Sequence, residues 1–122
     1  MDHHRSERVS ESVREELVEL ISFELGDPRL ETVEVLGVIV APNGRDATVR
    51  VGIRGDETAQ RRGLAALDHA IPYLRRQLAL RLALRRVPEL HFTLDPHPDA
   101  EDRVALLLKR AKKMRSRSEN LS

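Results

Sequence analysis

Cysteine and tryptophan are absent from this sequence of 122 residues, and two phenylalanines and one tyrosine are its whole aromatic content. Without cysteine the chain has no disulfide, no thiolate metal ligand and no thiol nucleophile, which favours a reducing, cytoplasmic location. So few aromatic side chains argue against the stacking platforms on which RRM and cold-shock domains bind bases. Recognition by this chain must therefore depend largely on charge.

Long apolar runs are missing as well. No stretch approaches the roughly 18 apolar residues of a membrane-spanning helix. The first residues, MDHHRSERVS, lack the basic and apolar segments of a secretory leader. The length allows one buried core but not two, so we expect a single soluble domain with no membrane partner.

Enzyme signatures are also lacking. The sequence contains no HExxH, no P-loop and no GxSxG pattern. Its histidines fall in separate segments: His3, His4, His69, His91 and His97. We therefore expect no enzyme activity, no metal, no cofactor and no small-molecule substrate.

Charge is present in quantity and is unevenly distributed. Residues 1–36 hold four arginines against ten acidic residues, whereas residues 70–86 hold five arginines and no acid. Residues 109–117 hold six lysines and arginines, again with no acid. This polarity suits a protein that turns one face toward a polyanion, although basic stretches can also be merely solvated.

Hydrophobic periodicity predicts the order helix, strand, strand, helix, helix, strand, followed by a C-terminal helix. The first helix should start after Ser6 or Ser10 as its cap and run to about Leu25, where Gly26 and Pro28 should stop it. Strands are expected at 32–42 and 46–54, joined as a hairpin by the turn PNGR, and at 89–95. Phe23 and Phe92 fall at expected core positions. The domain plan is a flexible N-terminus (1–5), a domain (6–98), a helix (99–114) and a basic disordered tail (115–122).

The segment 56–86 has a helical rhythm with a proline in its middle, and Asp56 or Thr58 is its expected cap. Its apolar positions lie three and four residues apart: Leu64, Leu67, Ile71, Leu74, Leu78 and Leu82. Pro72 cannot donate to the carbonyl of Asp68, and it disfavours the α conformation at Ile71. The sequence therefore predicts two helices that share a buried face and meet at a kink formed by Ala70, Ile71 and Pro72.

This order, with a small three-stranded mixed sheet covered by helices, resembles the α+β type II KH domain, an RNA-binding module. The usual GxxG clamp lies between the paired helices, whereas the GIRG spacing here, at 52–55, ends a strand instead. Four stretches resemble the bacterial ribosome-binding factor A family, whose KH-like domain has an Ala-x-Gly kink: RVSESVREELVELISFEL, DPRL, VLGVIVAPNGRDATVRV and LDHAIPYLRRQLALRLALRRVPELHFTLD. Pro72 departs from that pattern by replacing the kink glycine.

The resemblance implies a monomeric factor that binds the small (30S) ribosomal subunit and its 16S rRNA. It also implies help in late maturation and pre-rRNA processing, including cold adaptation, without catalysis. The RNA-binding candidates are the basic residues after the kink, with Tyr73, and the basic tail: Arg75, Arg76, Arg81, Arg85, Arg86, Lys109, Arg110, Lys112 and Lys113. Three of them, Arg75, Arg76 and Arg86, share an arc of about 100° on a helix, whereas Arg81 and Arg85 can equally be structural.

One alternative function remains open on the sequence. The chain can be a protein-interaction module that docks through the exposed edge of the hairpin or through the acidic first helix, without contacting RNA. In that case the basic stretches are solvated surface.

Overall fold

The computed structural model describes residues 3–95 of the chain. The elements in order are α1 (His3–Glu19), the π-helical turn η1 (Leu20–Glu24), the 3-10 turn η2 (Pro28–Leu30), β1 (Val33–Val40), β2 (Asp46–Ile53), α2 (Glu57–Leu82) and β3 (Glu89–Leu94). The expected C-terminal helix and the basic tail lie outside the described residues.

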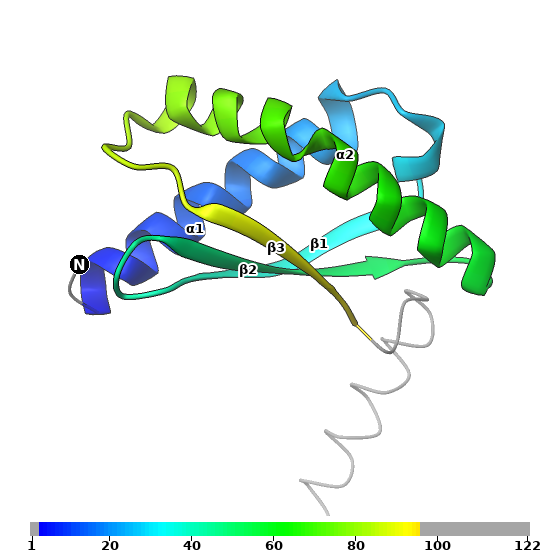
Figure 1. The fold of residues 1–122 in the computed structure, drawn as a ribbon, viewed down its shortest axis with the longest axis horizontal. Helices are drawn as coiled ribbons and strands as arrows, with labels where there is room; N and C mark the ends of the chain where they lie inside the picture. Colours follow the sequence, from blue (N-terminus) through cyan, green and yellow to red (C-terminus); the bar gives the residue numbers. More distant parts are fainter. Residues whose placement is uncertain (1–2, 96–122) are drawn as a thin grey trace, which may run out of the picture.

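The three strands form one mixed sheet in the order β1-β2-β3. The β1 and β2 strands are antiparallel, whereas β2 and β3 are parallel and are joined through α2. Figure 1 shows both long helices on the same side of the sheet, where they cross over it. The predicted α+β architecture is confirmed.

The core lies between the helices and the sheet, with β2 at its centre. Every second residue of β2 from Ala47 to Ile53 is completely buried. Fully buried leucines from both helices pack over these positions: Leu17 from α1, and Leu67, Leu74 and Leu78 from α2. The alternating buried residues of the strand and the apolar helix residues spaced three and four apart thus pack in one core.

The β1–β2 hairpin turns at the expected residues. The amide of Gly44 donates to the carbonyl of Ala41 at 2.8 Å, and the Asn43 side chain accepts from the amide of Arg45 at 2.8 Å. Gly44 has φ of +73°, a conformation in which glycine is favoured over residues with a Cβ. The sequence prediction of a hairpin at PNGR is confirmed.

The first helix begins earlier than expected, at His3, so Ser6 and Ser10 lie inside it. Neither serine is the expected helix cap, because both lie inside the helix, and both hydroxyls instead bond to the β1 backbone. The Ser6 hydroxyl donates to the carbonyl of Val40 at 2.6 Å, and the amide of Val40 donates to the Ser10 hydroxyl at 2.8 Å. The two serine side chains thus provide hydrogen-bond partners for the backbone of Val40 at the edge of the sheet, where no neighbouring strand does so.

The end of the first helix widens into the π-turn η1, where the amide of Leu25 donates to the carbonyl of Leu20 at 2.9 Å. The turn keeps Leu20 and Ile21 buried but leaves Phe23 75% exposed. The expectation of Phe23 in the core is wrong, because a π-turn changes the angular spacing of successive side chains. Phe92, by contrast, is partly buried against the core. Gly26, with φ of +65°, then ends the helical segment as predicted.

The prediction of two separate helices around Pro72 is wrong. A single α-helix, α2, runs from Glu57 to Leu82 and contains Pro72, so Ile71 stays helical. Its start is as expected, since the Asp56 side chain accepts from the amide of Ala59 at 2.9 Å. Pro72 is exposed, so the hydrogen bond it removes lies on the solvent side, where a helix can bend over its sheet without ending. Figure 1 shows α2 changing direction near its middle.

Candidate nucleic-acid interface

Arg75, one of the leading RNA-binding candidates, is held by the loop that follows α2. Its guanidinium donates to the carbonyl of Val87 at 2.9 Å and to that of Pro88 at 3.2 Å. A third guanidinium nitrogen lies 3.8 Å from the Glu89 carboxylate, and 37% of the side chain is exposed. Arg75 therefore connects α2 to the beginning of β3.

Arg81 is also engaged within the molecule. Its guanidinium forms two hydrogen bonds of 2.6 Å to the Glu24 carboxylate and one of 3.3 Å to Glu16. These hydrogen bonds lower the pKa of Glu24 and raise that of Arg81. Arg81 thus ties α2 to the first helix and its π-turn, the structural role that the sequence left open for it.

Three other candidate arginines have side chains that bind no other residue within 3–95. Arg76 on α2, and Arg85 and Arg86 in the following loop, are exposed and form no hydrogen bond or ion pair with any described residue. Tyr73 is half-buried and packs against the core, so little of its ring is available to stack on a base. The remaining candidates, Lys109, Arg110, Lys112 and Lys113, lie outside the described residues.

The loop that carries Arg85 and Arg86 is fixed at both ends. It begins at Ala83, whose left-handed conformation (φ 48°, ψ 39°) ends α2 abruptly. It ends where Arg75 binds two of its carbonyls, and where the amide of Glu89 donates to the carbonyl of Arg45 at 2.8 Å. Two exposed arginines are therefore presented on a loop with a defined position.

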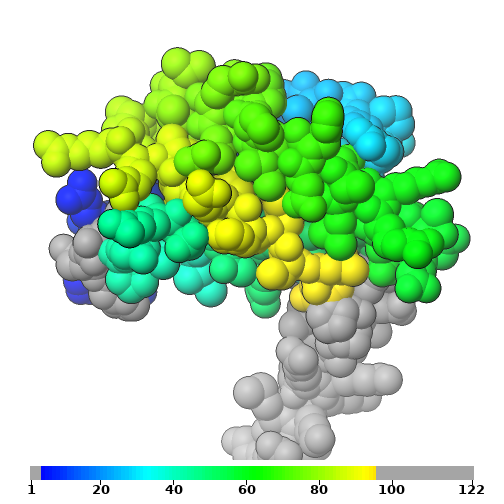
Figure 2. All heavy atoms as spheres, in the orientation of Figure 1, coloured from blue at the N-terminus to red at the C-terminus, as the bar shows by residue number. Residues whose placement is uncertain are grey.

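This loop forms one wall of a surface pocket of about 380 Å³, which we call the arginine pocket. The other walls come from α1 and from the hairpin turn. Its lining residues are Arg5 and Val9 from α1, Asn43 and Gly44 from the turn, and Leu84, Arg85 and Arg86 from the loop. Figures 1 and 2 show the three segments together at the left end of the molecule. Among residues 3–95, three arginines and no carboxylate line the pocket, so it is suited to an anion.

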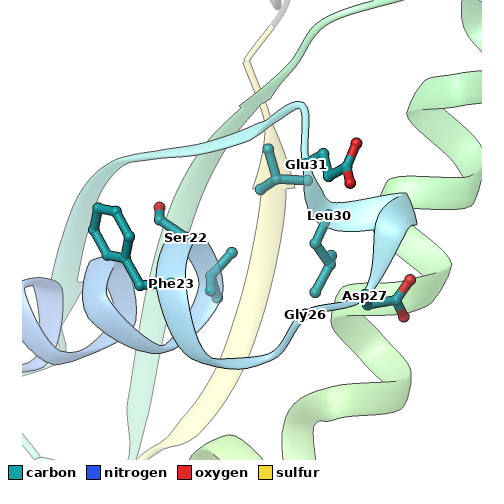
Figure 3. Close-up of a pocket in the computed structure, with 8 residues that line it drawn as sticks. Ser22, Phe23, Gly26, Asp27, Leu30 and Glu31 are labelled. Atoms are coloured by element: carbon teal, nitrogen blue, oxygen red, sulfur yellow. The ribbon is translucent and has the colours of Figure 1, made fainter.

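Two other pockets carry acidic groups. One of about 270 Å³ lies between the turns η1 and η2, and Figure 3 shows the exposed ring of Phe23 on one side of it and the carboxylates of Asp27 and Glu31 on the other. Hydrogen bonds from Arg29 lower the pKa of Asp27. A third pocket, along β1, includes Glu7 and Glu11. Among these three pockets, charge favours the arginine pocket for a polyanion.

Within residues 3–95, no group of three or more histidine, aspartate or glutamate side chains is placed to hold a metal ion. No helix in the same part of the chain is both long enough and apolar enough to cross a membrane.

The element order and the sheet topology define an α+β domain of the KH-like type II class. The chain belongs to the ribosome-binding factor A family, whose sequence profile matches residues 5–108. It is 55% identical to ribosome-binding factor A of Solibacter usitatus, over all of this chain and 99% of that protein. It is 42% identical to that of Koribacter versatilis, over 97% of this chain and 95% of the relative.

Structures of relatives have the same fold. The crystal structure of ribosome-binding factor A from Thermus thermophilus superimposes with a TM-score of 0.65 at 30% identity, covering 73% of this chain and 93% of the other. A homology model of Thermus thermophilus ribosome-binding factor A, fitted into the cryo-EM map of its 30S complex, gives a TM-score of 0.59 at 33% identity, covering 74% of this chain and 94% of the other.

Sequence reasoning did not identify Arg5, Asn43 or Gly44 as neighbours of Arg85 and Arg86. These residues lie about 40 positions apart along the chain and follow no common motif. Their proximity depends on how α1 and the hairpin pack, which no local pattern reports.

Proposed function

We propose that this protein is a cytoplasmic, monomeric ribosome assembly factor. It binds the small (30S) ribosomal subunit and its 16S rRNA, and it assists late maturation and pre-rRNA processing, including growth in the cold. It acts by binding and not by catalysis. Membership of the ribosome-binding factor A family and the 30S complex of the Thermus thermophilus relative support this proposal.

The observation that carries the proposal is the separation of the arginines into engaged and free side chains. Arg75 and Arg81 hold the fold together, whereas Arg76, Arg85 and Arg86 extend into solvent without an acidic partner among the described residues. Free guanidinium groups can neutralise backbone phosphates, and the release of counterions makes such binding favourable at low salt. The proposed RNA contacts are therefore Arg76, Arg85 and Arg86, with the basic tail as a second contact.

Binding to purified small subunits at several salt concentrations tests the function. The full-length protein should bind immature 30S particles, with an affinity that falls steeply as salt rises. Replacing Arg76 by glutamate should weaken the binding without changing the fold. Absence of salt-sensitive association with small subunits or their RNA contradicts the proposal. Accumulation of precursor 16S rRNA in cold-grown cells that lack the protein tests the processing role.

The alternative of protein docking without RNA has less support. Ser6 and Ser10 already bond the backbone of Val40 on the exposed edge, and on the acidic first helix Glu11 pairs with Arg14 and Glu16 with Arg81. A pull-down repeated after nuclease treatment separates the two. A partner that remains bound after the RNA is removed favours docking.

A further inference from the structure

We propose that the arginine pocket binds one nucleotide of single-stranded RNA. In this arrangement Arg85 and Arg86 hold the phosphate, while the sugar or base lies against Val9 and Leu84. The inference rests on the proposed RNA-binding function and names the part of the RNA that this site recognises. It is independent of the bend at Pro72, where the sequence alone directed attention.

Charge is the first reason. Arg85 and Arg86 are exposed, border the pocket and have no partner among the described residues, and Arg5 adds a third positive charge from α1. In the described part of the chain, no carboxylate lines the pocket to compete for Arg85 and Arg86. Guanidinium groups bind phosphate oxygens through paired hydrogen bonds, which makes arginine the favoured side chain for such a site.

Preorganisation is the second reason. The hydrogen bonds from Arg75 to Val87 and Pro88, and the bond from Glu89 to Arg45, hold the loop against α2 and the hairpin. Loss of conformational freedom opposes binding, so a loop fixed in advance binds more tightly than a mobile one carrying the same charges. The arginines of this pocket are thus better placed than an equal number on a free segment.

Size and lining are the third reason. A volume of about 380 Å³ falls within the range of small-molecule pockets and exceeds the need of an isolated phosphate. Val9 and Leu84 are both partly buried apolar side chains at its wall, and they provide a surface for a ribose or a base. Bases of a duplex are stacked and paired, so an unpaired nucleotide is the unit that can enter.

The test is an NMR titration of the full-length protein with hexauridylate RNA and, separately, with inorganic phosphate. The reporters are the amide of Gly44 and the methyl groups of Val9 and Leu84. Hexauridylate should shift all three, whereas phosphate should bind more weakly and leave the methyl groups unmoved. Equal affinity for phosphate and hexauridylate, or shifts confined to other surfaces, overturns the proposal.

Matched variants complete the test. Replacing Arg85 and Arg86 together by glutamate should weaken hexauridylate binding about tenfold or more, and should reduce the salt slope by about 0.7 for each phosphate that is no longer neutralised. The control replaces Arg61 and Arg62, another exposed arginine pair on α2, in which Arg61 donates only a 3.4 Å hydrogen bond to the Thr58 hydroxyl. That pair lies about 30 Å along the helix from the loop. Equal losses of affinity in both double variants overturn the proposal.

A third variant tests the contact with the sugar or base separately from the contact with the phosphate. Leu84→Ser should weaken binding of hexauridylate while leaving binding of inorganic phosphate unchanged. If small subunits bind normally to the Arg85/Arg86 double variant, and hexauridylate does not shift the pocket signals of the parent protein, this inference fails and the assembly function stands. Should hexauridylate occupy the pocket of a protein that does not bind small subunits, the assembly function fails and the inference stands.

Discussion

The guanidinium of Arg75 donates a hydrogen bond to the carbonyl oxygen of Val87, with 2.9 Å between the two atoms. This bond joins the C-terminal part of α2 to the loop before β3, which contains Arg85 and Arg86. A basic residue within a run of basic residues thus orders its neighbours, and the run is not one uniform binding surface.

Loss of the Arg75 side chain should destabilise the fold. Arg75→Ala leaves the Val87 and Pro88 carbonyls without their donor, and charged hydrogen bonds contribute about 1.5–3 kcal/mol each when shielded from water. Because 37% of the side chain is exposed, we expect a smaller total loss, about 1–2 kcal/mol. Thermal unfolding followed by circular dichroism measures it, and Arg76→Ala should change Tm little. Equal Tm values in the two variants contradict the role given to Arg75.

Ala83→Gly should stabilise the protein. Ala83 ends α2 with φ of 48°, which strains a residue that has a Cβ and suits glycine. The expected gain is about 0.5–1 kcal/mol, since the added flexibility of the unfolded glycine chain offsets part of it. Ala79→Gly, four residues earlier on the exposed side of α2, should instead cost about 1 kcal/mol. Chemical denaturation compares the two, and losses of stability in both variants count against strain at Ala83.

Pro72→Ala should raise Tm. The alanine amide can donate to the carbonyl of Asp68, which Pro72 leaves without this bond inside the helix. The gain should be less than the roughly 3 kcal/mol that an interior proline costs a straight helix, because the leucines on the buried side pack in the bent form. Hydrogen exchange at position 72 should detect the new bond. A lower Tm means that the packing requires the bend.

Glu24→Gln should make stability less dependent on acid pH. Arg81 holds the pKa of Glu24 below its ordinary value of 4.5 in the folded protein. A lowered folded-state pKa stabilises the fold above the unfolded-state pKa, and the effect is lost as pH falls through the folded-state value. The variant should therefore have a lower Tm than the parent at pH 7, and the two values should converge in strongly acidic buffer.

The control for this titration is Glu19→Gln at the end of α1, since Glu19 is exposed and forms no ion pair with a described residue. Its Tm should follow that of the parent across the pH range. Parallel curves for the parent and Glu24→Gln show that the Glu24–Arg81 pair does not contribute to stability.

Local patterns were accurate where one short segment decides its own structure. Asn43 and Gly44 make the hairpin turn, Gly26 ends the first helical segment, and Asp56 caps α2, because each acts on a backbone group a few residues away. The same reasoning grouped Arg75 with Arg76 and Arg86 on one helical arc and left a structural role open for Arg81 and Arg85. It could not show that Arg75 is engaged like Arg81, or that Arg85 is free like Arg86, because the partners of the engaged arginines lie on other elements.

The sequence by itself determined the order of the strands and of the helical segments between them, the division of charge along the chain and the membership of the family. Periodicity, turn residues and capping residues are properties of neighbouring positions, which explains this success. Tertiary structure alone decided that α2 continues through Pro72 and that Ser6 and Ser10 form hydrogen bonds to the edge strand β1. It also decided which arginines have no partner among the described residues. Each of these depends on contacts between segments far apart in sequence, and packing of the common core sets those contacts.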